Sequence, residues 1–401
     1  MNRRSFAGLV YRSGLTAWLG QLLPWHPRGS LIPAAAAPVV NVRDFGARGD
    51  GKTDDTAAFN RCIKSLADSG GTARVPQGVY VIDPTRSVVM INNLTLALDK
   101  GAVLQAIPVA ANAYAVIAGK NLHNVTVIGG AIIGDREAHL GSAGEWGMGI
   151  DFRACSDVRI EAVHVSGCWG DGLYVGTNAG VESQRVTIRN CVSRRNRRQG
   201  LSLTGCRGCL IEDCEFSDTA GTSPQSGIDL EPNAHGVVRD VTIRRCTVLR
   251  NAGWGITMSA NVEAVTVRDS HVGANGREGI AMSHVTNCSV SNSRLDDNGQ
   301  NGFGIRSSIG VVLAGNTICG NGRRSPGHYN NIVVDRGAAG TVVSNNIFEC
   351  DAAGSDVPRY DVRINSPDCK GTQIVGNRFH RGKTPGGLSD RGTSTIVQQG
   401  P

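Results

Sequence analysis

Residues 186–203 read Val186-Thr-Ile-Arg-Asn-Cys-Val-Ser-Arg-Arg-Asn-Arg-Arg-Gln-Gly-Leu-Ser-Leu203, and residues 241–258 read Val241-Thr-Ile-Arg-Arg-Cys-Thr-Val-Leu-Arg-Asn-Ala-Gly-Trp-Gly-Ile-Thr-Met258. Each run opens with an apolar–polar–apolar triplet and closes with a glycine followed by a second such triplet. Alternation with a period of two predicts a β-strand that buries one face. A glycine before the second strand suits a sharp corner.

The opening triplet recurs along the chain at intervals of about 23 residues, with insertions of up to ten. A period between 20 and 50 residues indicates a solenoid, a propeller or an array. Leucine-rich repeats would need Leu-rich units, and a WD propeller would need about 40 residues for each blade. Short strands without helices therefore predict an all-β parallel β-helix. The ten triplets are residues 125–127, 158–160, 186–188, 209–211, 241–243, 265–267, 288–290, 311–313, 341–343 and 372–374.

Small side chains recur between the two strands and predict a third, shorter strand. Three residues after the triplets lie Cys191, Cys214, Cys246, Ser270, Ser293, Asn316, Asn346 and Asn377. Because the column changes from Cys to Ser and Asn, we expect buried free thiols rather than a metal site or an obligatory disulfide. A second column, in the turn before the glycine, consists of Asn196, Asn251, Asn275, Asn298 and Asn321. Asparagine tolerates left-handed backbone and can form a hydrogen-bonded ladder.

The first 37 residues have the features of an export signal. Arg3-Arg4-Ser5-Phe6 is typical of a twin-arginine signal, and the small residues of 34–37 suit a signal peptidase. We expect residues 1–37 to be removed and the mature protein to be periplasmic or secreted in a bacterium, with no membrane attachment. The net charge of +7 falls to +3 without the four arginines of this segment, which does not indicate a nucleic-acid binder.

The segment after the signal carries a family resemblance. Residues 41–56, which begin Asn41-Val-Arg-Asp-Phe-Gly-Ala, and residues 75–82 resemble the opening of the pectate-lyase-like superfamily, which includes rhamnogalacturonases and some epimerases. The resemblance implies a single-stranded right-handed parallel β-helix, here of about ten coils, capped by a short N-terminal helix. It divides residues 38–401 into a cap and first coil (38–82), coils (83–380) and a tail (381–401). Asp54 or Asp55 is a suitable N-cap, so capping and turn roles are expected for these acids.

Substrate grooves of this superfamily run along one parallel sheet, and here the glycine-led strand is the candidate. Outward positions of these strands and the turns that enter them supply the expected binding residues. Trp rings stack on sugars, and Arg side chains bind carboxylates or sulfates. The expected substrate-binding residues are Asp151, Trp169, Tyr174, Arg198, Trp254 and Arg306.

Asp229 and Glu231 are the predicted catalytic pair, with Asp171 as a further candidate. Ile228 and Leu230 should point into the core, so the two acids between and after them should point outward. Residues two apart on a strand place Cα atoms about 6.5–7 Å apart, which suits the paired carboxylates of glycosidases. The same pair could instead share a Ca²⁺ ion through hard oxygen ligands.

Three functions remain open from the sequence. The first is a monomeric glycoside hydrolase that acts on a polysaccharide and requires no cofactor. The second is a polysaccharide lyase or C5-epimerase acting on uronic acids, in which Ca²⁺ could take part. The third is a carbohydrate-binding β-helix without turnover. The Gly-His-Gly motif of polygalacturonases and the Asp-Pro-His-Asp motif of mannuronan epimerases are both absent, so neither specific chemistry is indicated.

Overall fold

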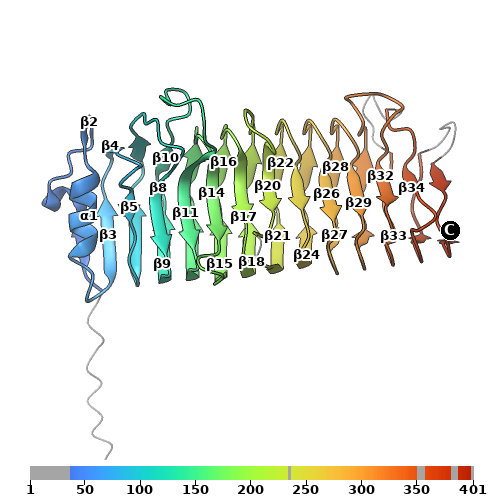
Figure 1. The fold of residues 1–401 in the computed structure, drawn as a ribbon, viewed down its shortest axis with the longest axis horizontal. Helices are drawn as coiled ribbons and strands as arrows, with labels where there is room; N and C mark the ends of the chain where they lie inside the picture. The colour runs from blue at the N-terminus through green and yellow to red at the C-terminus, as the bar shows by residue number, and fades with distance from the viewer. Residues whose placement is uncertain (1–36, 234–235, 350–356, 381–386, 399–401) are drawn as a thin grey trace, which may run out of the picture. The chain divides into compact units, whose positions relative to one another are not determined.

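The computed structural model describes residues 37–233, 236–349, 357–380 and 387–398. The predicted signal peptide lies, except for Ala37, outside these residues and stays a prediction. Three parallel sheets of 14, 11 and 12 strands, called sheets A, B and C here, make up the described chain. Figure 1 shows their strands stacked side by side in chain order. Across the described residues, no helix has the length and apolar character that a membrane crossing requires.

Sheet A contains the ten predicted triplets. They overlap ten of its strands, from β9 to β35, and in the last four of these the triplet begins one residue before the strand. Its strands are β1 Val39–Asn41, β3 Gly71–Val75, β6 Leu94–Leu98, β9 His123–Ile128, β12 Ser156–Glu161, β15 Ser183–Arg189, β18 Cys206–Glu212, β21 Val238–Arg244, β24 Val262–Arg268, β27 Ser289–Ser291, β30 Val312–Ala314, β33 Val342–Ser344, β35 Gln373–Val375 and β37 Ile396–Gln398.

Sheet B is built from the short third strands, and sheet C from the glycine-led strands. Sheet B comprises β2 Asp50–Asp54, β4 Gly78–Ile82, β7 Ala102–Ala106, β10 Ala131–Ile133, β13 His164–Ser166, β16 Val192–Arg194, β19 Glu215–Ser217, β22 Thr247–Leu249, β25 His271–Gly273, β28 Arg294–Asp296 and β31 Thr317–Cys319. Sheet C comprises β5 Val88–Val89, β8 Ala113–Lys120, β11 Trp146–Arg153, β14 Asp171–Gly176, β17 Gln199–Leu203, β20 Ser226–Leu230, β23 Ile256–Met258, β26 Ile280–Ser283, β29 Phe303–Arg306, β32 Ile332–Asp335, β34 Val362–Ile364 and β36 Leu388–Asp390.

The residues expected to form a tail continue the coils. Strand β36 pairs with β34 in sheet C, and strand β37 pairs with β35 in sheet A. Each of these strands hydrogen-bonds to the exposed edge of the coil before it.

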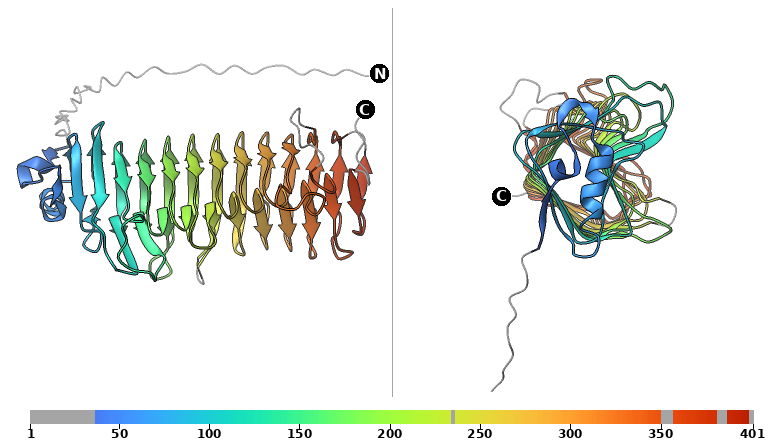
Figure 2. Two further views of the ribbon diagram at one scale, coloured as in Figure 1. Left: turned by 90° about the horizontal axis from the view of Figure 1, so that it is seen from above. Right: turned by 90° about the vertical axis from the view of Figure 1, so that its left-hand side faces the viewer.

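A short helix covers the N-terminal end of the coils, as predicted. Helix α1 (Thr56–Lys64) follows the 3₁₀ helix η1 (Val42–Phe45), and Figure 2 shows α1 lying across this end. Asp55 is the N-cap residue of α1, but it is the preceding acid, Asp54, whose Oδ1 accepts the N–H of the first helical residue, Thr56, at 3.0 Å. The carboxyl of Asp55 holds the preceding loop by accepting the N–H groups of Arg48 and Gly49 at 2.7 and 3.0 Å. These two acids therefore have the capping and turn roles expected for them.

The glycines that open the sheet C strands are required by space rather than by backbone conformation. A Cβ on Gly227 would lie 2.4 Å from Val248 Cγ1, and a Cβ on Gly255 would lie 2.4 Å from Val272 Cγ1. Neither glycine has a positive φ. The chain bends instead at residues such as Arg250 (φ 55°) and Ala274 (φ 52°), which precede the ladder asparagines. The left-handed backbone was therefore expected at the asparagines, whereas it occurs at the residue before each of them.

Asparagine side chains form a buried ladder inside one corner of the coils. Asn251 donates to Asn275 Oδ1 at 2.9 Å, Asn275 to Asn298 at 3.0 Å, and Asn298 to Asn321 at 2.9 Å. Each of the first three Oδ1 acceptors, on Asn275, Asn298 and Asn321, also receives the backbone N–H of the preceding ladder residue. Because every rung satisfies both backbone and side-chain groups, this corner can be buried without unpaired polar atoms.

The second corner holds the cysteine column, and its thiols are free. Cys191, Cys214 and Cys246 are buried and unbridged. The Cys191 N–H points at the sulfur of Cys214 at 3.4 Å, and the Cys246 N–H donates to Ser270 Oγ at 3.1 Å. In this column a side chain therefore accepts a hydrogen bond from the backbone N–H of the column residue one coil earlier. The acceptor is a cysteine sulfur, a serine hydroxyl or an asparagine amide oxygen. Elsewhere in the fold, Cys319 is disulfide-bonded.

The ladder yields a stability prediction. Replacing Asn298 by Ala should lower the free energy of unfolding by about 1–3 kcal/mol, because the amides of Asn275 and Asn321 lose buried partners. The shift of the urea unfolding midpoint measures this loss. Asn112→Ala, at an exposed site, is the matched control and should leave the midpoint in place. Equal midpoints for the two variants would show that the ladder does not stabilise the fold.

Candidate functional site

In-register pairing places the outward side chains of sheet C in rows. Asp229 on β20 lies opposite Ser202 on β17 and Thr257 on β23. The inward neighbours Ile228 and Leu230 are fully buried in the core, so the acid is directed to the outer face as predicted. Neighbouring strands lie about 4.8 Å apart, which brings side chains from successive coils into contact.

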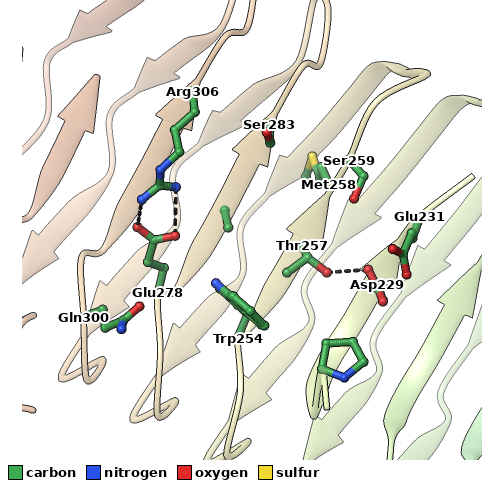
Figure 3. A pocket seen from close by; sticks show the side chains of 12 residues that line it. Asp229, Glu231, Trp254, Thr257, Met258, Ser259, Glu278, Ser283, Gln300 and Arg306 are labelled. Atoms are coloured by element: carbon green, nitrogen blue, oxygen red, sulfur yellow. Dashed lines mark hydrogen bonds and ion pairs between the residues drawn. The ribbon is translucent and has the colours of Figure 1, made fainter. Parts of the chain in front are cut away.

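A cavity of about 370 Å³ opens on this face between β20 and β29. Figure 3 shows Asp229 and Glu231 on one side of it, the paired Glu278 and Arg306 on the other, and Trp254 between them. The turn before β20 contributes Pro224 to the wall of this cavity. The lining consists of Pro224, Asp229, Glu231, Trp254, Thr257, Met258, Ser259, Glu278, Ala281, Ser283, Gln300 and Arg306.

Asp229 is held in a buried and strongly hydrogen-bonded position. Gln199 Nε2 donates to its Oδ2, and Thr257 Oγ1 donates to its Oδ1. Only 3% of the residue is exposed. Burial raises the pKa of Asp229 to about 7, the Thr257 hydrogen bond opposes this rise, and the nearby charge of Glu231 adds to it. Asp229 is therefore a carboxyl that can carry a proton near neutral pH.

Glu231 lies at the exposed rim beside Asp229. It follows the last residue of β20, and its backbone N–H donates to Leu203 O at 3.1 Å. This bond fixes the backbone while the carboxylate faces solvent and the cavity. The predicted pair thus comprises one buried carboxyl and one solvated carboxyl. Two acids in such different environments can take different roles in one reaction.

Asp171 is fully buried and does not line the cavity. Ser202 Oγ donates to its Oδ2 at 2.7 Å, and Arg198 Nη1 lies 3.2 Å from the same oxygen. Burial raises the pKa of Asp171 to about 6, with the Arg198 charge opposing the rise. Arg198 also pairs with Glu145 at 3.5 Å. Asp171 and Arg198 therefore act on Asp229 only through their charges, which respectively raise and lower its pKa.

Three of the predicted binding residues are engaged elsewhere. Tyr174 is buried under Arg153, 4.5 Å from its ring centroid, and its hydroxyl accepts from Thr204 at 2.7 Å. Asp151 pairs with Arg153 at 2.8 Å. The Trp169 ring stacks on the His139 ring, with 4.0 Å between the ring centroids, and the Arg197 guanidinium lies over the Trp169 ring, 3.7 Å from its centroid. Trp254 and Arg306, in contrast, do line the cavity.

Gln199 was not among the residues predicted from the sequence, although Asp171 and Trp254, which share its column, were. The residue before each strand glycine is aligned with its equivalents, as Asp171, Gln199 and Ser226 show. In the next coils this position holds Trp254, Glu278 and Asn301. These side chains neighbour the outward row, so the position before the glycine was the signal that could have identified Gln199.

The sequence allowed Asp229 and Glu231 to share a Ca²⁺ ion, and the surroundings of Asp229 can be compared with what such a site needs. Ca²⁺ takes six to eight oxygen ligands. Within residues that the structure describes, no group of three or more His, Cys, Asp or Glu side chains is arranged to hold a metal ion. Each oxygen of Asp229 accepts one hydrogen bond, from Gln199 or from Thr257, which leaves one lone pair on each oxygen for a further donor or a cation.

Comparison with known proteins shows which proteins have a similar sequence or the same fold. The uncharacterized protein YclG of Bacillus subtilis is 30% identical over 325 residues, which are 70% of this chain and 55% of YclG. The A-module of mannuronan C-5 epimerase AlgE6 from Azotobacter vinelandii superposes with a TM-score of 0.76 at 20% identity, over 90% of this chain and 98% of the module. The tailspike gp49 of Acinetobacter baumannii bacteriophage Fri1, a capsular polysaccharide depolymerase, gives 0.53 at 15%, over 88% of this chain and 63% of gp49.

The chain spans about half the length of the first curated relatives it matches. Structures below 25% identity establish a common fold and nothing about the reaction. The family model of the right-handed β-helix region matches residues 78–228, 145–308, 179–348 and 254–399. Together these overlapping matches extend over most of the chain and over all three sheets. The chain therefore belongs to the right-handed β-helix family.

Proposed function

We propose that this protein is a polysaccharide-active enzyme, and specifically a glycoside hydrolase whose catalytic pair is Asp229 and Glu231. The observation that carries the proposal is a buried carboxyl with a pKa of about 7 at the wall of a cavity, beside an exposed carboxylate. Glycosidases need one carboxyl that is protonated and a second that is ionised at the same pH. The two environments supply this difference.

Asp229 is the proposed general acid. When it binds a proton, Oδ2 must remain an acceptor because the Gln199 amide nitrogen can only donate to it. The proton therefore belongs on Oδ1, next to Thr257. The hydroxyl of Thr257 can accept a hydrogen bond as readily as donate one. Gln199 thus holds Oδ2, and the proton on Oδ1 lies beside the Thr257 hydroxyl at the cavity wall. For proton transfer, a glycosidic oxygen in the cavity would replace the Thr257 hydroxyl as the acceptor of this hydrogen bond.

Glu231 is the proposed base or nucleophile. Its position on the exposed rim keeps it solvated, and solvation favours the ionised carboxylate. It can either activate a water molecule or attack the sugar carbon directly, which would give inversion or retention respectively. Trp254 lies between this pair and Glu278 in Figure 3, where its indole is placed to stack on a sugar ring.

The comparisons support a polysaccharide as substrate without naming the reaction. The structural neighbours include an epimerase module that acts on mannuronan and a capsular polysaccharide depolymerase. A lyase or C5-epimerase is therefore the outcome to separate from hydrolysis. Hydrolysis produces reducing ends alone, a lyase produces unsaturated sugars that absorb in the ultraviolet, and an epimerase changes the sugar without cleaving the chain. Assays with added Ca²⁺ and with a chelator belong beside these readouts.

Substitution of the pair tests the assignment. Asp229→Asn and Glu231→Gln should each lower kcat by about 100-fold or more, because each removes a proton-transfer group. Reducing-end release from the polysaccharide that the wild-type protein cleaves is the measurement. Asp157→Asn, an exposed acid on sheet A that pairs with Arg185, is the matched control and should keep wild-type turnover. Near wild-type activity of both pair variants would refute the assignment.

The pKa of Asp229 predicts the pH profile. A general acid acts only while protonated, so kcat/KM should fall about tenfold per pH unit once the pH rises above about 7. In Asp229→Asn the residual activity should lack this alkaline limb. A wild-type profile that stays flat from about pH 6 to pH 9 would contradict the proposed role.

A further inference from the structure

The charges of the cavity point to the class of sugar that the proposed hydrolase accepts. We propose that its binding site takes a neutral pyranose and disfavours a uronate or sulfated sugar. This inference rests on the proposed function, because it concerns the same cavity. The observation that supports it is the pairing of Arg306 with Glu278 in the cavity wall.

Arg306 is the one cation among the described residues that line the cavity. Its guanidinium is already engaged, since Nη1 lies 3.0 Å from Glu278 Oε2 and Nη2 contacts Glu278 Oε1. A bidentate pair of this kind uses the donor geometry that would otherwise clamp a carboxylate of the substrate. Arg306 is therefore not available to a uronate unless Glu278 gives way.

Glu278 is firmly fixed against such a movement. Its side chain is only 4% exposed, and Asn301 Nδ2 donates to Glu278 Oε1 at 2.7 Å. Asn301 is held in turn, because its own Oδ1 accepts the Asn330 N–H at 2.9 Å. Removing Arg306 from this carboxylate would leave a buried charge without its partner, which is costly.

With Arg306 neutralised, the remaining charge of the lining is the carboxylate of Glu231, joined by that of Asp229 once the pH exceeds about 7. Asp229 and Glu231 stand at the end of the cavity opposite Arg306, three strand spacings or about 14 Å away. Arg277 lies over the Trp254 ring, 4.3 Å from its centroid, and is not part of the lining. Arg198, near Asp229, is paired with Asp171 and Glu145. Within the lining, a substrate carboxylate would thus meet carboxylates and no unpaired cation, whereas an uncharged ring could stack on Trp254 and hydrogen-bond to hydroxyl groups without this repulsion.

The test uses matched pairs of oligosaccharides that differ only at C6, where one member has a carboxylate and the other a hydroxymethyl group. The pairs are galacturonan and galactan, glucuronan and glucan, and mannuronan and mannan. Binding to the wild-type protein is measured by titration calorimetry at low salt. In the best-bound pair the neutral member should bind about tenfold more tightly or better, because the lining carboxylates repel the carboxylate of the other member.

A charge variant sharpens the test. Glu278→Gln keeps the shape of the side chain and releases the Arg306 guanidinium, so the ratio of the affinity for the uronate to the affinity for its neutral partner should rise about tenfold. Asp297→Asn, which removes an exposed acid paired with Arg323 outside the cavity, is the matched control and should leave this ratio unchanged.

The outcomes for this inference and for the proposed function are distinct. Tight binding of the neutral member without any product would refute the hydrolase and leave the sugar preference standing. Equal or tighter binding of the uronate by the wild-type protein would overturn the preference, even if hydrolysis is observed. Failure of both members of all three pairs to bind would also overturn it. The wild-type comparison decides the matter even if Glu278→Gln fails to fold.

Discussion

Every feature of this protein depends on the stacking of coils at one strand spacing. Backbone hydrogen bonds between parallel strands fix that spacing at about 4.8 Å, so equivalent residues of successive coils must tolerate contact with their own counterparts. Inside the coils this favours columns of one small residue type. The asparagine ladder satisfies the constraint with hydrogen bonds between identical side chains, and the glycine column satisfies it by leaving space for Val248 and Val272.

The same constraint acts on the outer face and creates the candidate site. Carboxyls, amides and hydroxyls from neighbouring coils are held within hydrogen-bond distance without any loop having to fold over them. Asp229 is buried although it points outward, because Gln199 from one coil before and Thr257 from one coil after close around it. Its raised pKa is therefore a consequence of stacking. The cavity likewise extends along the stack, from β20 to β29.

The sequence was sufficient for the fold and only partly sufficient for the site. Period and alternation predicted the strands, the cysteine and asparagine columns and the outward direction of Asp229, because each of these properties is local and repeats. Which side chains pair across coils depends on rotamers and on neighbours about 23 to 30 residues away. Sequence reasoning could therefore not reveal that Trp169 is occupied by His139 and Arg197 while Trp254 lines the cavity. Nor could it reveal that Glu278 neutralises Arg306.

The central claim is that stacking makes Asp229 a proton donor near neutral pH, and a direct titration of that one carboxyl tests it. Difference infrared spectra between the wild-type protein and Asp229→Asn isolate the carboxyl band as the pH is varied. The account predicts that the band titrates with a midpoint near 7. A midpoint near the ordinary value for Asp, about 4, would contradict it, because the carboxyl would then be ionised throughout the range in which a general acid must hold its proton.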